Sequence, residues 1–197
     1  HIINDLLRHG INRFLISAYY LSDQIKRFAD ELSMGARIEV LVEEEPLGTA
    51  GALGLIGNDV TGPLLVVNGD IVTRADFSAM SLHHQLHKRD LTIGAARYEF
   101  EIPYGVLEHR DDGSVIKIRE KPQHVSHVSG GIYILEPSIY RMISTPKPLD
   151  MPVLIERAIA DEMKVGIFPI HEYWLDMGRP DDLQRAEDQT SHWLDGK

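Results

Sequence analysis

Two aspartates far apart in the sequence each follow an apolar run, and together they could hold a metal ion. Asp70 ends the segment Leu64-Leu-Val-Val-Asn-Gly-Asp70, and Asp176 lies within Tyr173-Trp-Leu-Asp-Met-Gly178. A short buried strand delivers the residue at its carboxyl end to the crevice where open α/β sheets bind ligands. Mg²⁺ is bound through one or two carboxylates together with substrate phosphates. Each aspartate alone is equally typical of a turn, but the pair predicts an enzyme that handles nucleotides or phosphates with Mg²⁺.

Glycines stand where the backbone could approach a ligand closely. Gly48 follows an expected strand and opens an expected helix, whose first N–H groups favour a phosphate or the edge of a base. Gly69 stands beside Asp70, and Gly105 and Gly130 stand where two later strands begin. Each of these glycines is also typical of a tight turn or a bulge, and the turn is favoured for Gly48 when its segment is taken alone.

Charged and imidazole side chains form two further candidate sites. Glu120 and Lys121 stand side by side at a strand end, where Lys121 could meet a phosphate and Glu120 could accept sugar hydroxyl groups. Adjacent opposite charges are equally typical of a solvated strand end. His83, His84 and His87 share one expected helix, but no acidic motif of a zinc enzyme accompanies them. We therefore expect these histidines on the surface of the helix.

Apolar runs alternate with amphipathic segments, which predicts an α/β protein with a largely parallel sheet covered by helices. The pattern changes at about 91–135, where strands follow one another with little helix and would wall a substrate pocket. No repeat or linker divides the chain, so 1–197 is expected to be a single domain. Strands are expected at 13–18, 37–42, 64–67, 91–98, 105–109, 115–119, 131–135 and 165–169, and helices at 1–10, 22–32, 49–56, 76–88, 152–161 and about 180–193.

The composition excludes several classes of partner. The net charge of −10 argues against a general affinity for nucleic acid, which needs clustered Lys and Arg. The chain has no cysteine, so it has neither disulfides nor thiolate metal sites, which fits the reducing cytoplasm. No apolar stretch approaches the length of a membrane span, and no signal peptide is visible, so no membrane partner is expected. A homo-oligomer is left open.

Six segments, taken in order, resemble the sugar-1-phosphate nucleotidylyltransferases, also called nucleoside-diphosphate-sugar pyrophosphorylases. The resemblance covers nearly the whole chain and implies a Rossmann-like, three-layer α/β/α fold with a mostly parallel or mixed sheet. The matching segments are Pro46-Leu-Gly-Thr-Ala-Gly-Ala-Leu53, Val67-Asn-Gly-Asp70, Pro103-Tyr-Gly-Val106, Glu120-Lys-Pro122, Ser129-Gly-Gly-Ile-Tyr133 and Trp174-Leu-Asp-Met-Gly-Arg-Pro180.

The resemblance implies roles for the matching residues. Asp70 and Asp176 would hold Mg²⁺, and Lys121, the third catalytic residue, would hold the attacking sugar phosphate. The implied nucleotide-binding residues are Gly48, Thr49, Asn68 and Gly69. The implied substrate-binding residues are Tyr104, Gly105, Glu120, Lys121, Ser129 and Gly130, and Ser129 stands where the family often has Asn.

The implied reaction transfers a nucleotidyl group from a nucleoside triphosphate to a sugar-1-phosphate. The sugar phosphate attacks the α-phosphorus in line, and pyrophosphate leaves. Such chemistry needs positioning and charge neutralisation rather than a protein nucleophile, and the sequence has no nucleophile motif. Residues 168–180 resemble members that carry a cystathionine-β-synthase-type domain pair ahead of the transferase. Some of these members are similar to guanylyltransferases for amino sugars or other unusual sugars, so GTP is slightly favoured as the nucleotide.

One feature of the family has no match in these 197 residues. The family begins with a strand, the loop Gly-Gly-x-Gly-Thr-Arg-Leu and a lysine within a Pro-Lys-Pro segment. This chain has Pro146-Lys-Pro148, but it stands at the wrong place in the sequence and its match is coincidental. We expect these residues alone to be inactive, with a gap in the middle of the sheet or an assembly that fills it. The alternative function is a non-catalytic nucleotide-sugar-binding or regulatory module of the same fold. A metal-dependent glycosyltransferase would have an Asp-x-Asp motif, which Asn68-Gly-Asp70 matches poorly.

Overall fold

The computed structural model describes residues 2–31 and 35–178. The strands are β1 (Arg13–Ala18), β2 (Arg37–Val42), β3 (Leu64–Val67), β4 (Ile71–Thr73), β5 (Leu91–Glu101), β6 (Val106–His109), β7 (Val115–Arg119), β8 (Gln123–Leu135), β9 (Val165–Ile170) and β10 (Trp174–Asp176). The helices are α1 (Ile2–Arg8), α2 (Ser22–Glu31), α3 (Gly48–Gly51), the 3-10 helix η1 (Ala52–Leu55), α4 (Phe77–Leu86), α5 (Pro137–Tyr140) and α6 (Met151–Ala160). The helix expected at about 180–193 lies outside the described residues.

Four strands form a mixed central sheet in the order β3-β8-β5-β9. β8 runs antiparallel to both of its neighbours, whereas β5 and β9 are parallel. The ladder between β5 and β8 extends from the pair Leu91–Leu135 to the pair Glu101–Gln123, with a register shift near Gly94. The expected α/β class with a mixed sheet is confirmed. The two long strands exceed their expected lengths because they stay paired far beyond the sheet.

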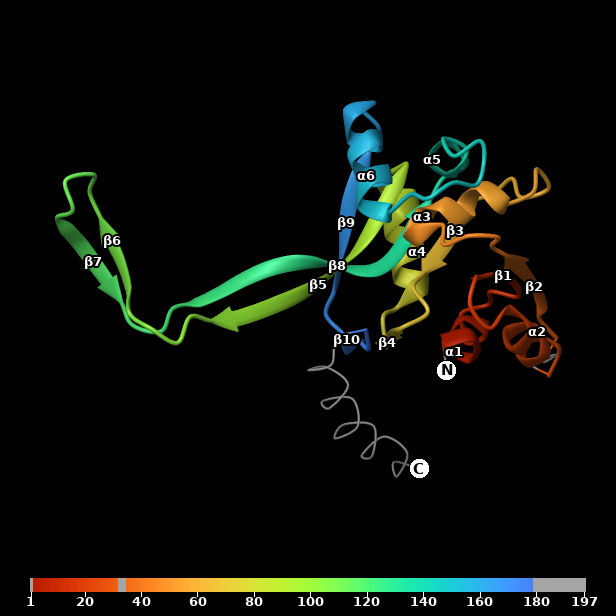
Figure 1. The fold of residues 1–197 in the computed structure, drawn as a ribbon, viewed down its shortest axis with the longest axis horizontal. Helices are drawn as coiled ribbons and strands as arrows, with labels where there is room; N and C mark the ends of the chain where they lie inside the picture. Colours follow the sequence, from red (N-terminus) through yellow and green to blue (C-terminus); the bar gives the residue numbers. More distant parts are fainter. Residues whose placement is uncertain (1, 32–34, 179–197) are drawn as a thin grey trace, which may run out of the picture.

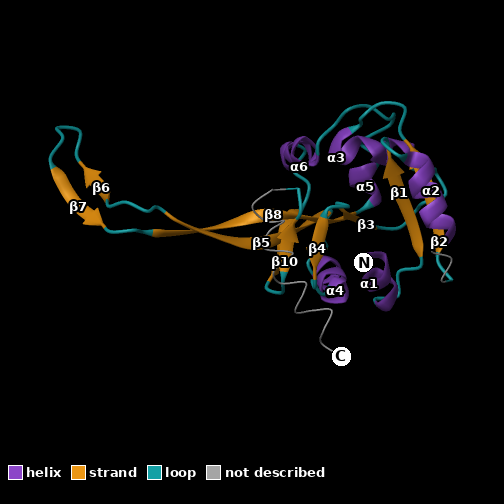
Figure 2. Ribbon diagram, turned by 60° about the horizontal axis from the view of Figure 1, so that its bottom comes forward, coloured by secondary structure: helices purple, strands orange, loops and turns teal. Residues whose placement is uncertain are grey.

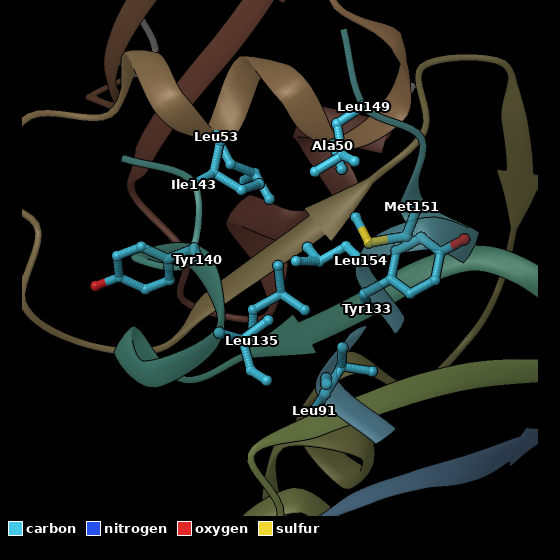
Figure 3. Packing of buried hydrophobic residues seen from close by; sticks show 12 residues of the cluster. Ala50, Leu53, Leu91, Tyr133, Leu135, Tyr140, Ile143, Leu149, Met151 and Leu154 are labelled. Carbon is cyan, nitrogen blue, oxygen red and sulfur yellow. The ribbon is translucent and has the colours of Figure 1, made fainter. Parts of the chain in front are cut away.

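Helices cover both faces of this sheet (Figure 2). Successive side chains of a strand point to opposite faces, so Tyr133 and Leu135 of β8 pack on one side and Ile132 and Ile134 on the other. The first side packs against α3, η1, α5 and α6, where Leu154 is fully buried (Figure 3). The second side packs against α1 and α4. Burying one such aliphatic side chain contributes about 1.5–3 kcal/mol, so these two clusters hold the three-layer arrangement that was expected.

β1 and β2 form a separate parallel pair. Within the described part of the chain, β1 pairs only with β2, and β3 pairs only with β8. Both strands line one groove of about 1140 Å³, to which Leu15 and Ile16 of β1 and Leu65 and Val67 of β3 contribute. The divided sheet agrees with the expected gap in its middle.

The outer halves of β5 and β8, together with β6 and β7, form a two-stranded arm, residues 97–127. The arm projects away from the remaining structure in both views (Figures 1 and 2). None of its residues, all of which the structure describes, is buried. This part of the chain was expected to wall a pocket beside the sheet; the continuous ladder between β5 and β8 carries it outward instead.

The histidines of α4 correct one expectation. His84 was expected on the surface, but only 2% of it is exposed, because this face of α4 packs on the sheet. Its Nδ1 lies 2.7 Å from the Thr92 hydroxyl and its Nε2 lies 3.1 Å from a Glu136 carboxylate oxygen. The described residues contain no group of three or more His, Cys, Asp or Glu side chains that could hold a metal ion. Nor does this part of the chain contain a helix with the length and apolar character needed to cross a membrane.

Candidate functional site

Asp70 and Asp176 meet at the end of β3. β10 pairs antiparallel with β4, which places Asp176 opposite Ile71, the residue that follows Asp70. The Met177 N–H donates to the Asp70 carbonyl at 2.9 Å, and the Gly178 N–H donates to the Asp176 carboxylate at 2.9 Å. A Cβ placed on Gly178 would lie 3.1 Å from a carboxylate oxygen of each aspartate, so those two oxygens lie within twice that distance of one another. The strand-end pair expected from the sequence therefore comes together.

Trp174 ties this pair to the central sheet. Its indole N–H donates to the Gly130 carbonyl of β8 at 2.8 Å. At the same end of β10, the Thr73 hydroxyl donates to the Tyr173 carbonyl at 3.0 Å. The first residue of β10 is therefore fastened to β8, and the residue before it to β4, and Asp176 lies two residues farther along this short strand.

Asn68 and the glycines of β8 lie directly beside the carboxylates. The Asn68 N–H donates to the Gly131 carbonyl at 2.9 Å. Gly131 has a φ of +66°, and a Cβ there would lie 2.3 Å from the Ile71 Cδ1 and 2.9 Å from the Asn68 side-chain nitrogen. Only glycine fits a backbone position that is both left-handed and this crowded. The Asn68-Gly69-Asp70 turn therefore packs closely against Gly130 and Gly131.

Ser129 has a partner within its own strand. Its hydroxyl lies 2.8 Å from the Tyr133 hydroxyl. Burial raises the pKa of Tyr133, and the hydrogen bond with Ser129 opposes that shift. Because Tyr133 is neutral at physiological pH, its hydroxyl can donate this hydrogen bond to the Ser129 oxygen, which leaves the Ser129 O–H able to donate to a ligand.

Thr49 lines the groove between β1 and β3, and Gly48 precedes it at the start of α3. Gly48 has a φ of +71°, and a Cβ there would approach an Asp150 carboxylate oxygen to 2.6 Å. The Thr49 hydroxyl accepts from the Met151 N–H at 2.7 Å, which caps the first turn of α6. Thr49, Asn68 and Gly69 all line the groove. Three of the four residues expected to bind nucleotide therefore share one cavity.

The remaining expected site residues lie on the arm. Gly105 immediately precedes β6 and Glu120 follows β7, and a Cβ on Gly105 would lie 3.1 Å from a Glu120 carboxylate oxygen. Lys121 has a φ of +43°, and both Lys121 and Tyr104 are exposed. Figure 1 shows β6 and β7 at the far end of the arm, away from β4 and β10. The structure therefore brings Tyr104, Gly105, Glu120 and Lys121 near one another but not to the aspartates of the same chain.

A small hollow of about 230 Å³ beside Trp174 contains residues that sequence reasoning missed. Arg97, His171 and Glu172 line it together with Ala96 and Ile170. Their only sequence signal is position: His171 and Glu172 immediately precede the Tyr-Trp-Leu-Asp segment. The hollow is a polar recess with one cation, one carboxylate and one imidazole, and it is bordered by Trp174.

The donor set suits a hard divalent cation. Two carboxylates at adjacent positions leave most of an octahedral shell for water and phosphate oxygens, which is how Mg²⁺ is usually held in phosphoryl-transfer sites. Asp176 is half-buried and Asp70 is exposed, so substrate phosphates could reach both. The arrangement can therefore hold a metal ion together with an anionic substrate at the edge of a groove.

Curated relatives of this chain are named as mannose-1-phosphate guanylyltransferases. The chain is 32% identical over 191 residues to the "Mannose-1-phosphate guanylyltransferase catalytic subunit beta" of Danio rerio, covering 93% of this chain and 53% of that protein. The protein of the same name from Dictyostelium discoideum is 30% identical over 190 residues, again covering 93% and 53%. The chain thus spans little more than half the length of these curated relatives.

Solved structures show the same fold. HddC from Yersinia pseudotuberculosis matches with a TM-score of 0.70 and 24% identity, covering 95% of this chain and 83% of that one. A putative glucose-1-phosphate thymidylyltransferase from Bacillus anthracis matches with a TM-score of 0.71 and 20% identity, covering 96% and 80%. The family model for nucleotidyl transferases matches residues 1–192. The chain belongs to the nucleotidyl transferase family.

Proposed function

We infer that the protein transfers a nucleotidyl group from a nucleoside triphosphate to a sugar-1-phosphate, giving a nucleotide-sugar and pyrophosphate. The observation that carries this proposal is the meeting of Asp70 and Asp176 at the sheet end in a chain of this family. Relatives named mannose-1-phosphate guanylyltransferases, at 30–32% identity, support GTP as the nucleotide. A cytoplasmic location remains part of the proposal, since nucleoside triphosphates are available there.

The metal in this proposal is Mg²⁺, held by Asp70 and Asp176. When bound, it would neutralise the triphosphate and polarise the α-phosphate toward attack. The chain's own residues do the positioning. Trp174 holds Asp176 through the Gly130 carbonyl, and Gly131 lets the Asn68 turn approach the sheet closely. Fixing two anionic reactants in line accounts for much of the acceleration in such reactions.

The nucleotide in this proposal enters the groove between β1 and β3. Thr49 fixes the segment that carries Gly48 by capping α6, and Asn68 and Gly69 line the same groove as Thr49. The attacking sugar phosphate would be held by Lys121, while Glu120 would accept hydrogen bonds from sugar hydroxyl groups, with Tyr104 and Gly105 beside them. Ser129 and Gly130 would contact the sugar at the sheet end.

A substrate panel tests this function. The protein in its natural full-length form is incubated with Mg²⁺, one of the common nucleoside triphosphates and one sugar-1-phosphate, and pyrophosphate release is measured. We expect the highest rate with GTP, and no release from residues 1–197 alone because they lack the glycine-rich phosphate loop. Tight binding of a nucleotide-sugar by the full-length protein without turnover of any pair would instead support the non-catalytic binding module.

A further inference from the structure

The arm (residues 97–127) exposes an unusual amount of apolar surface for a two-stranded ribbon. Its two faces carry eight large apolar side chains that are 38–74% exposed: Tyr98, Phe100, Tyr104, Leu107, Val115, Ile116, Ile118 and Val125. A two-stranded hairpin is marginally stable in water without a further layer. Exposed apolar surface of this extent is typical of a site that another molecule covers.

The arm is held away from the body of its own chain by a regular ladder. Five consecutive cross-strand pairs, from Arg97–His127 to Glu101–Gln123, continue the pairing of the central sheet. The rings of Phe100 and His124 stack at 5.3 Å, and the Ile102 N–H donates to the Pro122 carbonyl at 3.1 Å. These contacts keep the two strands paired along the direction in which they leave the sheet.

The same ladder separates two halves of the proposed site. Gln123 and Ser129 both lie on β8, and six extended residues span about 20 Å. Lys121 lies beyond Gln123, whereas Ser129 lies next to Gly130 at the sheet end. A sugar-1-phosphate held at Lys121 of one chain therefore cannot reach the Asp70–Asp176 pair of that chain while the ladder is intact.

We propose that two copies of this chain exchange arms, so that Glu120 and Lys121 of one copy complete the Asp70–Asp176 site of the other. This inference rests on the proposed function, because it assigns these four side chains to one reaction. A two-fold arrangement forms two equivalent sites and covers the apolar surface of both arms at once. It also places an ammonium group beside two carboxylates and the anionic substrate.

The charges of the arm favour this placement. Arg97 and Arg119 form ion pairs with Glu99 and Glu108 of the same arm. Among the described residues, Lys121 has no ion-pair partner of its own. Its charge is therefore available to the carboxylates and phosphates of a second copy.

Complementation between two variants tests the exchange directly, in assays at a sugar-1-phosphate concentration far below the raised KM of Lys121→Ala, where both variants are nearly inactive. Asp176→Asn and Lys121→Ala chains in their natural full-length form are co-expressed with different tags, and the heterodimer is purified through both tags. With exchanged arms, one of its two sites combines an intact aspartate pair with an intact lysine, so we expect about half of the wild-type rate of pyrophosphate release. If each arm served its own chain, both sites would carry one defect, and the heterodimer would be as inactive as either parent.

The assembly itself is measured by size-exclusion chromatography with light scattering. We expect the wild type to be a dimer, and the double variant Ile116→Asp/Ile118→Asp on β7 to lose the exchanged contact and the complementation. Ile159→Asp on α6 is the matched control, since Ile159 is 58% exposed but lies off the arm, and it should change neither. Circular dichroism verifies that the variants are folded.

The outcomes separate this inference from the function on which it rests. A monomeric wild type, or a dimer without complementation between two individually inactive variants, would overturn the exchange and leave the transferase function standing. Wild-type rates in both single-variant homodimers would contradict the transferase roles of these residues instead.

Discussion

β5 and β8 each run from the centre of the sheet to the arm, and the two halves of the same strands have different surroundings. Leu91 and Leu135 at their inner ends are fully buried between helical layers, whereas the outer residues are exposed on both faces. The ladder of hydrogen bonds continues through both halves. Pairing therefore sets the direction of the arm, while side-chain burial sets how much free energy is needed to open each half.

The proposed site residues are also divided between the sheet end and the arm. The sheet end holds the aspartates with tight contacts around Gly131 and Trp174, and the arm carries Glu120 and Lys121 on an exposed ribbon. At the sheet end, a substitution of an aspartate should change the chemistry, and a substitution of the closely packed Gly131 should change the fold around it. A substitution on the arm should change substrate affinity or assembly with little effect on unfolding.

The largest expected effect is at the carboxylate pair. Asp70→Asn or Asp176→Asn should reduce the rate of pyrophosphate release at least about 100-fold, because one metal ligand at a phosphoryl-transfer site is lost. Both side chains are at least partly exposed, so the melting temperature should change little. Asp111→Asn at the tip of the arm is the matched control and should keep the wild-type rate. Wild-type turnover in both sheet-end variants would show that the pair is not the metal site.

Glycine substitutions compare the two regions by backbone strain. Gly131→Ala should lower the free energy of unfolding by about 2–5 kcal/mol, because left-handed strain adds to a clash with Ile71. Gly113 in the arm hairpin has a similar φ of +82° but nothing within 4 Å of an added Cβ. Gly113→Ala should cost only about 1–2 kcal/mol locally, with little change in global unfolding. Urea titration of both variants measures the difference; equal losses would mean that the arm unfolds together with the sheet.

Lys121→Ala should raise the KM for the sugar-1-phosphate more than the KM for the nucleotide. Removal of a charge-assisted phosphate contact costs about 1.5–3 kcal/mol, or about a 10- to 100-fold rise in KM. Lys117→Ala, four residues earlier on the same arm, should leave both constants unchanged. A rise confined to the nucleotide KM would assign Lys121 to the triphosphate instead.

The smallest expected effect is a dependence of stability on pH that arises from His83 of α4. Burial against the sheet, together with His87 and Arg89, lowers the pKa of His83 below its ordinary value of 6.5. The unfolded state then binds the proton more readily, so His83 makes stability fall as the pH drops below about 6.5. His83→Gln should flatten this part of the curve in urea titrations between pH 7 and 5. Identical curves for the variant and the wild type would contradict the assignment.

Much of the body could be predicted from the sequence. Apolar runs indicated β1, β2, β3 and β9, because short buried strands have a local signature. The meeting of Asp70 and Asp176 was predictable from two strand ends and the family resemblance. β4 was missed, since three residues are too few to show an alternation. His84 was misplaced because its burial depends on how α4 sits on the sheet.

The direction of the arm could not be predicted. The segments at 105–109 and 115–119 were expected as strands, and the hairpin between them follows from Asp111-Asp-Gly113. Whether such a hairpin returns to the sheet depends on how far along their length β5 and β8 stay paired. The outer residues of both strands are exposed, so no buried face in the sequence marks where the pairing ends. The location of Tyr104, Gly105, Glu120 and Lys121 relative to the aspartates was therefore a question of tertiary structure alone.

The groove between β1 and β3 also bears on how the protein behaves at high concentration. An open strand edge is a template that another chain can extend, and here two such edges line the same cavity. Residues 1–197 expressed alone should therefore capture extended apolar segments, first from one another, as the concentration rises. The same opening offers an engineering route, because a short apolar peptide supplied in trans could close the sheet. The length and sequence of the peptide could be selected by how well it prevents aggregation.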